Sequence, residues 1–152
     1  MKILFCVPFP LDLKLGASQA AIELANGMEK SGWKCTMASE NEIYPDINQY
    51  KGIKRMSIFA QKLRKFLQQH AMRFDAVDYD VSCLPYPRSD FYKHTLFVAR
   101  SQLLHYHFKT IKIPRFKTWR SLAGLLIKEP LRKLELNFTC RQTTTTLKNA
   151  DL

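Results

Sequence analysis

The stretch that decides the fold is residues 1–39, MKILFCVPFPLDLKLGASQAAIELANGMEKSGWKCTMAS. It contains two apolar runs of strand length, Lys2–Pro8 and Lys34–Ser39. Between them, apolar residues recur at helical spacing from Ser18 to Ser31. Strand, loop, helix and strand in this order predict a βαβ unit that opens a parallel sheet. Because such sheets bind ligands beyond the carboxyl ends of their strands, we expect the chemistry after the first run and around Gly16.

The expected first helix carries signals at both ends. Ser18 is predicted to cap its start, because a serine hydroxyl can accept a hydrogen bond from a first-turn N–H group. Gly32 suits the left-handed position that follows a helix, and Trp33 is predicted to fold back as the apolar contact of a Schellman motif. Together these residues place the helix between the two strands.

The rest of the chain continues the alternation of strands and helices. A polar loop is expected over residues 40–52 and a stiff loop with two prolines over residues 85–90. Expected strands cover residues 53–58, 74–84 and 95–99. Expected helices cover residues 58–72 after a Ser57 cap, the residues after a Ser101 cap, and residues 130–147 with Pro130 in the first turn. The pattern predicts a Rossmann-like three-layer α/β/α domain with a mostly parallel sheet.

Composition bounds the class of protein. A chain of 152 residues with 46% hydrophobic content can bury one sizeable core, so a single domain over residues 1–152 is expected. The formal net charge of +11 favours anionic partners, namely membrane headgroups, nucleic acids or phosphorylated ligands. The alternative is a basic half of a longer protein whose other half is more acidic.

The cysteines and the apolar runs indicate a cytoplasmic protein. The four cysteines lack CxxC spacing, which disfavours a zinc site and a thioredoxin-type motif, and Cys6, Cys35 and Cys83 are expected to be buried free thiols. The first apolar run is too short for a signal peptide. No run of about 18 apolar residues predicts a transmembrane helix.

Most of the chain resembles the N-terminal domain of GT-B glycosyltransferases, especially the retaining class called GT4, and the matching motifs lie near its two ends. Near the start, Gly16-Ala17-Ser18 and the helix end Leu24-Ala25-Asn26-Gly27-Met28-Glu29-Lys30-Ser31-Gly32-Trp33 match the family's pattern. Leu147–Leu152 is similar to the helix that leads into the strand before the interdomain crossover. Two features depart from the family: the first loop has the single Gly16 where many members have two glycines, and Arg100 stands where many carry histidine.

The resemblance implies the acceptor-side half of an enzyme that moves a sugar from a nucleotide-sugar donor to a glycan, lipid-linked or small-molecule acceptor. It implies retention of configuration without a bound metal or other cofactor. The family's second domain, which binds most of the donor and carries a paired-glutamate motif, is absent from residues 1–152. The chain alone is therefore expected to be inactive, and the parent enzyme to be cytoplasmic and peripheral at the inner face of the membrane.

Substrate contacts are expected at two places, and no catalytic residue is assigned. The helix start after the first strand offers N–H groups for the donor's phosphates or the reacting sugar, and its glycine allows close approach of the backbone. Arginines that follow later strand ends are expected to face the interdomain cleft and to bind phosphate or carboxylate. The expected substrate-binding residues are Gly16, Ala17, Ser18, Gln19, Arg88, Arg100 and Ser101.

Two further pairs of titratable residues have open alternatives. Asp78 and Asp80 would share one face of a strand, where they could act as a carboxylate pair, or one could cap a turn while the other pairs with a lysine. His105 and His107 would share a face only on a strand, so on the expected helix they disfavour a common metal site.

The main alternative is a stand-alone basic α/β binding module for a nucleic acid or a membrane surface. Residues 51–73 contain seven Lys or Arg and no acidic residue, and residues 109–120 mix basic with bulky side chains. We hypothesise that these two segments dock on an anionic membrane or an anionic acceptor. Nucleic acid is not expected, because common RNA-binding folds place their aromatic residues on an exposed sheet. A dinucleotide or P-loop site is disfavoured because neither G-x-G-x-x-G nor G-K-[ST] occurs.

Overall fold

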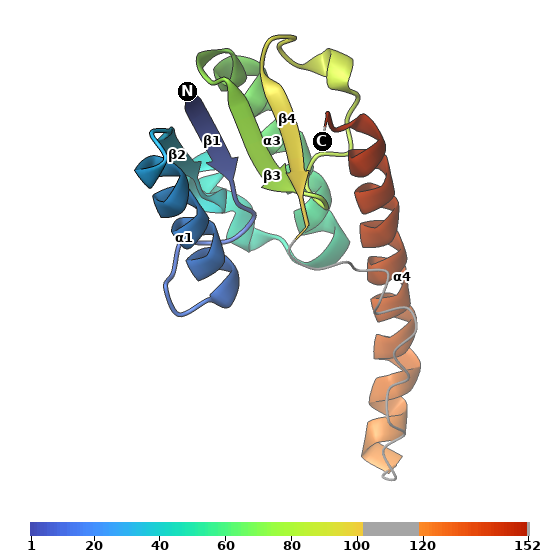
Figure 1. Cartoon of the computed structure of the whole chain (residues 1–152). Helices are drawn as coiled ribbons and strands as arrows, with labels where there is room; N and C mark the ends of the chain where they lie inside the picture. The colour runs from blue at the N-terminus through green and yellow to red at the C-terminus, as the bar shows by residue number, and fades with distance from the viewer. Residues whose placement is uncertain (102–118, 152) are drawn as a thin grey trace.

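The computed structural model describes the backbone of residues 1–101 and 119–151 and the side chains of residues 1–101 and 130–151. One four-stranded sheet has the order β2-β1-β3-β4, with every pair of neighbours parallel. Its strands are β1 Lys2–Cys6, β2 Lys34–Ala38, β3 Ala76–Asp80 and β4 Leu96–Arg100. The α-helices are α1 Gly16–Lys30, α2 Glu40–Ile43, α3 Gly52–His70 and α4 Trp119–Asn149. Helices flank the sheet (Figure 1), which confirms the predicted Rossmann-like α/β/α architecture.

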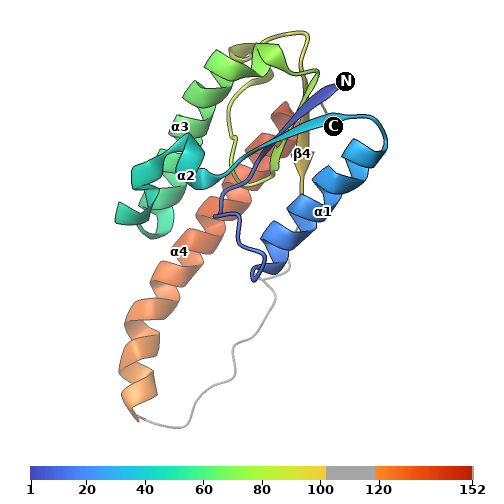
Figure 2. The same cartoon turned by 90° about the vertical axis from the view of Figure 1, so that its left-hand side faces the viewer.

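Strand β1 lies between β2 and β3, so the order of the sheet reverses beside it. From β1 the chain passes through α1 to β2, and from β2 it returns through α3 to β3 on the other side of β1. Figure 2 shows α1 and α3 on opposite faces of the sheet. The carboxyl ends of β1 and β3 flank this reversal, where open α/β sheets bind ligands. We call the edge formed by the carboxyl ends of the four strands the carboxyl edge.

Alternate residues of β1 pack on opposite faces of the sheet. Leu4 belongs to the core cluster that contains Leu63 and Leu67 of α3. Phe5 belongs to a second cluster with Ala25 of α1. Both faces of β1 are therefore buried, which explains why its sequence is a continuous apolar run without polar alternation.

The predicted end of α1 is confirmed in detail. Gly32 has a φ angle of +85°, and its N–H donates to the carbonyl of Glu29 at 3.0 Å. The N–H of Trp33 donates to the carbonyl of Met28 at 3.1 Å, and both side chains pack on the same core cluster. These two hydrogen bonds and the apolar contact form a Schellman motif.

Gly32→Ala is expected to lower the free energy of unfolding by about 1–2 kcal/mol, because a Cβ disfavours the left-handed conformation. No atom lies within 4 Å of the added Cβ, so the loss would come from the backbone alone. Gly27→Ala is the control: its Cβ also has room, the residue lies inside α1, and the change should stabilise by up to about 1 kcal/mol. Urea unfolding measures both changes in stability. Equal changes for Gly32→Ala and Gly27→Ala would contradict the assignment of a left-handed conformation to Gly32.

The expected start of the first helix and the expected strand over residues 53–58 are wrong. Leu15 is the N-cap of α1, and Ser18 lies in the first turn, where its hydroxyl donates to the carbonyl of Pro10 at 2.8 Å. Residues 53–58 belong to α3, so Ser57 lies inside that helix and does not cap it. A six-residue segment whose apolar residues are Ile53, Met56 and Ile58 does not distinguish a strand from part of a helix, and here it continues the helix that buries Phe59 and Leu63.

The segment of residues 40–52, which was expected to be a loop, is largely helical. It contains α2 and the 3₁₀ helix η1, Pro45–Gln49. Ser39 and Glu42 form a reciprocal capping box at the start of α2. The spacing S-x-x-E predicts such a box, and this signal was missed because the segment is short and polar.

The later boundaries shift by a few residues. β3 is shorter than the expected 74–84, because the Asp80 side chain accepts a hydrogen bond from the N–H of Ser82 and turns the chain. β4 starts one residue later than expected and ends at Arg100. Pro130 lies inside α4 and not in its first turn, because the helix already begins at Trp119. The helix expected after Ser101 falls on residues outside the described part of the chain.

Candidate functional site

The first turn of α1 lies at the carboxyl edge, directly after the loop that leaves β1. It contains four of the predicted substrate-binding residues, Gly16, Ala17, Ser18 and Gln19. The N-cap residue Leu15 makes no side-chain hydrogen bond to this helix start, and the first turn contains no acidic residue. The positive end of the helix dipole therefore faces the point where the sheet order reverses, and no carboxylate of the first turn compensates it.

Gly16 is not required by the protein's own conformation or packing. Its φ angle is not positive, and no atom lies within 4 Å of a Cβ placed on it. The space that a side chain would occupy is therefore open at the start of α1. A glycine in this position leaves room for a ligand to approach the backbone.

The polar side chains of the first turn, Ser18 and Gln19, form hydrogen bonds within the protein. Ser18 is fully buried, and its hydroxyl holds Pro10 through the 2.8 Å hydrogen bond described above. The amide of Gln19 donates to Glu23 one turn later at 2.9 Å. The contribution of this segment to binding would therefore come from its main chain.

Asp78 and Arg100 form a partly buried ion pair between β3 and β4. Asp78 is 5% exposed, and the Arg100 Nε lies 2.9 and 3.2 Å from its two carboxylate oxygens. Burial raises the pKa of the Asp78 carboxyl above its ordinary value, although the Arg100 guanidinium acts in the opposite direction. The predicted partner of this aspartate was a lysine, but the parallel register brings an arginine from the neighbouring strand.

Asp80 closes the turn after β3. One of its carboxylate oxygens accepts hydrogen bonds from the N–H of Ser82 at 2.9 Å and from the Ser82 hydroxyl at 2.5 Å. This confirms the alternative in which one aspartate of the pair caps a turn. The two carboxylates are thus held by separate partners, and each fixes a strand end at the carboxyl edge.

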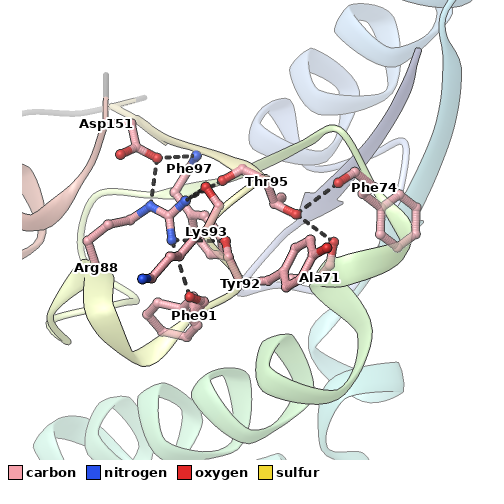
Figure 3. Close-up of polar contacts among 9 residues, drawn as sticks. All are labelled: Ala71, Phe74, Arg88, Phe91, Tyr92, Lys93, Thr95, Phe97 and Asp151. Atoms are coloured by element: carbon pink, nitrogen blue, oxygen red, sulfur yellow. Dashed lines mark hydrogen bonds and ion pairs between the residues drawn. The ribbon is translucent and has the colours of Figure 1, made fainter.

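Arg88 lies away from the first turn of α1, near the amino-terminal half of β4 (Figure 3). Its Nε donates to Asp151 at 2.8 Å, and its two NH₂ groups donate to main-chain carbonyls at 2.5 to 3.5 Å. These carbonyls belong to Phe91, Tyr92, Lys93 and Thr95. Since a guanidinium has five N–H donors, all of them have acceptors within the protein.

The geometric basis for placing Arg88 in a cleft is therefore wrong. The residue does not follow a strand end directly but lies in the 3₁₀ helix η3, Arg88–Asp90. Its guanidinium covers the Phe97 ring at 4.7 Å and joins the end of α4 to the sheet. Arg100 and the exposed Ser101, in contrast, do lie at the carboxyl edge, as predicted.

The basic segment over residues 51–73 is less available than its sequence suggests. Arg55 pairs with the buried Glu40, and Arg64 pairs with Asp90. Lys62 lies 4.4 Å from the ring centroid of Tyr44. Most of the other basic segment, residues 109–120, falls outside the described residues, as do His105 and His107.

Glu40 was missed by the sequence analysis. It is 2% exposed at the first position of α2, and its carboxylate is held by Arg55 from α3. A charged residue in a polar stretch gives no sign of burial, and its partner is fifteen residues away. The pair joins α2 to α3 beside the carboxyl end of β2.

Other kinds of site find no support in the described part of the chain. There, no group of three His, Cys, Asp or Glu side chains is placed to hold a metal ion. None of the four cysteines, all of which lie in the described residues, forms a disulfide, and burial raises the pKa of the Cys6 and Cys83 thiols. None of the helices formed by the described residues combines the length and the apolar character that a membrane span needs.

Comparison with protein-family models, with curated proteins and with solved structures found no match for this chain. The fold and the arrangement of the carboxyl edge therefore carry the functional argument.

Proposed function

We propose that this chain is the acceptor-side domain of a GT-B, GT4-like glycosyltransferase that transfers a sugar from a nucleotide-sugar donor with retention of configuration. The observation that supports this most directly is the start of α1, where the N-cap Leu15 makes no side-chain hydrogen bond and the space at Gly16 is unfilled. It lies where the order of a parallel sheet reverses, and such positions bind phosphorylated ligands.

The residues at the carboxyl edge would bind different parts of the substrates. The main chain at Gly16 would meet a phosphate or the reacting sugar, whereas the N–H of Gln19 already donates to the Leu15 carbonyl at 3.0 Å. Ser101 would contact the acceptor from the end of β4. Arg100 would act from its pair with Asp78, with one face toward the ligand. Arg88 is left out of this site, because its donors are all used within the protein.

The second candidate is a basic α/β module that binds an anionic partner without catalysis. The net charge of +11 favours it. In this case the partner would contact charged side chains and not the start of α1. The location of the chain would be cytoplasmic in both cases.

A titration of the ¹⁵N-labelled chain with millimolar UDP-glucose tests the first candidate. We expect amide shifts confined to Gly16, Ala17, Gln19 and Ser101, and none at Arg88. Binding should be weak, because the resemblance assigns most donor contacts to a domain that residues 1–152 do not contain.

Two leucine substitutions in the same helix make the test specific. Gly16→Leu should abolish the shifts by filling the open space, whereas Gly27→Leu, whose Cβ also has no neighbour within 4 Å, should leave them unchanged. Shifts that spread over the lysines of α3, or that survive Gly16→Leu, would favour the anionic-binding module. No shift with UDP-glucose or GDP-mannose at the start of α1 would count against the glycosyltransferase proposal.

A further inference from the structure

A groove of about 270 Å³ lies between α3, α4 and the loop that follows β3. Side chains from all three elements line it, among them Ser57 of α3, Pro85 and Tyr86 of the loop, and Phe138, Arg141 and Gln142 of α4. Such a concavity, apolar with a few converging polar groups, is the usual form of a small-molecule site. We call it the α3–α4 groove.

Gln142 is the buried polar side chain of this groove. It is 7% exposed, and its Oε1 is shielded from solvent and accepts no hydrogen bond from any described residue. Thr144 and Thr145 beside it donate to carbonyls one turn earlier in α4. A buried amide oxygen without a donor is unfavourable, and folded proteins supply one from the protein, from water or from a ligand. A hydroxyl held in the groove would supply the donor that Gln142 lacks.

Arg141 is the only charged residue among the described residues that line the groove. Its side chain is exposed, and it takes part in none of the ion pairs that the described residues form. A guanidinium binds a carboxylate through two parallel hydrogen bonds. Its single charge matches a carboxylate better than a phosphate monoester, which carries about −1.5 to −2 and three acceptor oxygens. The lining therefore favours a carboxylate.

Two aromatic rings form the apolar part of the lining. Phe138 of α4 and Tyr86 of the loop are both half-buried. Pro85 and Pro87 flank Tyr86 and restrict the backbone around it. The Arg64 guanidinium of α3 lies 4.8 Å from the centroid of the Tyr86 ring and holds it further. Fixed aromatic side chains favour a ligand that carries a ring of its own.

We propose that the α3–α4 groove binds a small aromatic carboxylate that carries a ring hydroxyl. The carboxylate pairs with Arg141, the ring lies against Tyr86 and Phe138, and the hydroxyl donates to Oε1 of Gln142. The volume of about 270 Å³ lies below the range of about 300–1,000 Å³ that drug-sized ligands occupy. A nucleotide sugar is too large for it, so this site would not serve the donor of the proposed function.

Two arginines of α4 give a matched pair of variants. Arg132 and Arg141 are both exposed and belong to no ion pair of the described residues, but Arg132 lines a different groove, of about 420 Å³. Isothermal titration calorimetry should show binding of meta- or para-hydroxybenzoate by the wild type. Arg141→Met should weaken it by about tenfold, and Arg132→Met, which removes the same charge, should leave it within about twofold.

The hydroxyl tests the role of Gln142. The better of the two hydroxybenzoates should bind about fivefold more tightly than benzoate, because its hydroxyl donates to Oε1. Gln142→Leu should abolish this preference and leave benzoate binding unchanged, since leucine is of similar size and accepts no hydrogen bond. In the ¹⁵N-labelled chain, the amide shifts should be centred on Tyr86, Phe138 and Gln142.

Four outcomes would overturn the proposal. They are absence of binding at millimolar concentrations of all three acids, equal losses in the two arginine variants, a hydroxyl preference that survives Gln142→Leu, and binding of cyclohexanecarboxylate as tight as that of benzoate. Circular dichroism and thermal unfolding check that the variants fold, and Arg141→Met changes an exposed residue, so it keeps the test decisive if Gln142→Leu does not fold. No sugar donor is added, so failure here would leave the glycosyltransferase proposal standing.

Discussion

Replacing Arg88 by methionine is expected to lower the free energy of unfolding by about 2–3 kcal/mol, because five acceptors lose a charged donor together and the contacts to the Phe91 and Thr95 carbonyls are partly buried. The Thr95 carbonyl lies 2.5 Å from the guanidinium, and the Tyr92 carbonyl lies 3.0 Å from it. The ion pair with Asp151 contributes less, since that carboxylate is 32% exposed and screened by solvent. Urea unfolding followed by circular dichroism measures the change.

Arg88→Lys distinguishes hydrogen bonding from charge. A lysine keeps the positive charge, but its compact ammonium cannot reach carbonyls on several sides, so we expect it to recover less than half of the loss. Asp151→Asn should cost less than about 1 kcal/mol, because the Phe97 N–H can still donate to the amide oxygen. If lysine restored full stability, the guanidinium network would not be the source of the effect.

The role of Arg88 shows why the sequence analysis failed at this residue. Four of its five acceptors are main-chain carbonyls, which leave no pattern in a sequence, and Asp151 is 63 residues away. Position along the chain suggested a strand end, but the strand had already ended at Asp80. The carbonyls lie only three to seven residues away, but contacts to main-chain groups, like the distant contact to Asp151, become visible only when the fold is known.

Local patterns were more informative at the start of the chain. The positions of the first two strands and the role of Gly32 were predicted because each depends on a few neighbouring residues: a run of apolar side chains, or one glycine with a positive φ angle. The prediction failed for residues 53–58, where a short segment of mixed apolar and charged residues does not distinguish a strand from a helix. The first turn of α1 was placed at the carboxyl edge because it follows β1 directly, whereas the Asp78–Arg100 pair required the register of β3 with β4.

Replacing Arg100 by glutamine is expected to destabilise the protein by about 2–4 kcal/mol at pH 8 and by clearly less at pH 5. At pH 8 the variant leaves a buried carboxylate with its charge uncompensated. Burial already holds the pKa of Asp78 above its ordinary value, and removing Arg100 takes away an interaction that lowers it. In the variant, this pKa therefore rises further.

The sign of the pH dependence follows from proton binding. A carboxyl whose folded pKa lies above its unfolded value binds more protons in the folded state, so its contribution to stability is largest at low pH. That contribution is lost as the pH rises from the unfolded value of 3.8 through the raised folded pKa. In the variant the folded pKa of Asp78 is higher, so the pH range over which this contribution is lost extends to higher pH. The difference in stability between wild type and variant must therefore grow with pH.

The double variant Arg100→Gln with Asp78→Asn separates charge from packing. It replaces the ion pair by two neutral amides, so that no unpaired charge remains buried between β3 and β4. We expect it to recover most of the stability lost at pH 8 and to lose the pH dependence, since neither remaining group titrates. Urea unfolding of the three proteins at pH 5 and pH 8 measures this. A loss for Arg100→Gln that is equal at both values would mean that the contact between the strands depends on the shape of the arginine and not on the charge of Asp78.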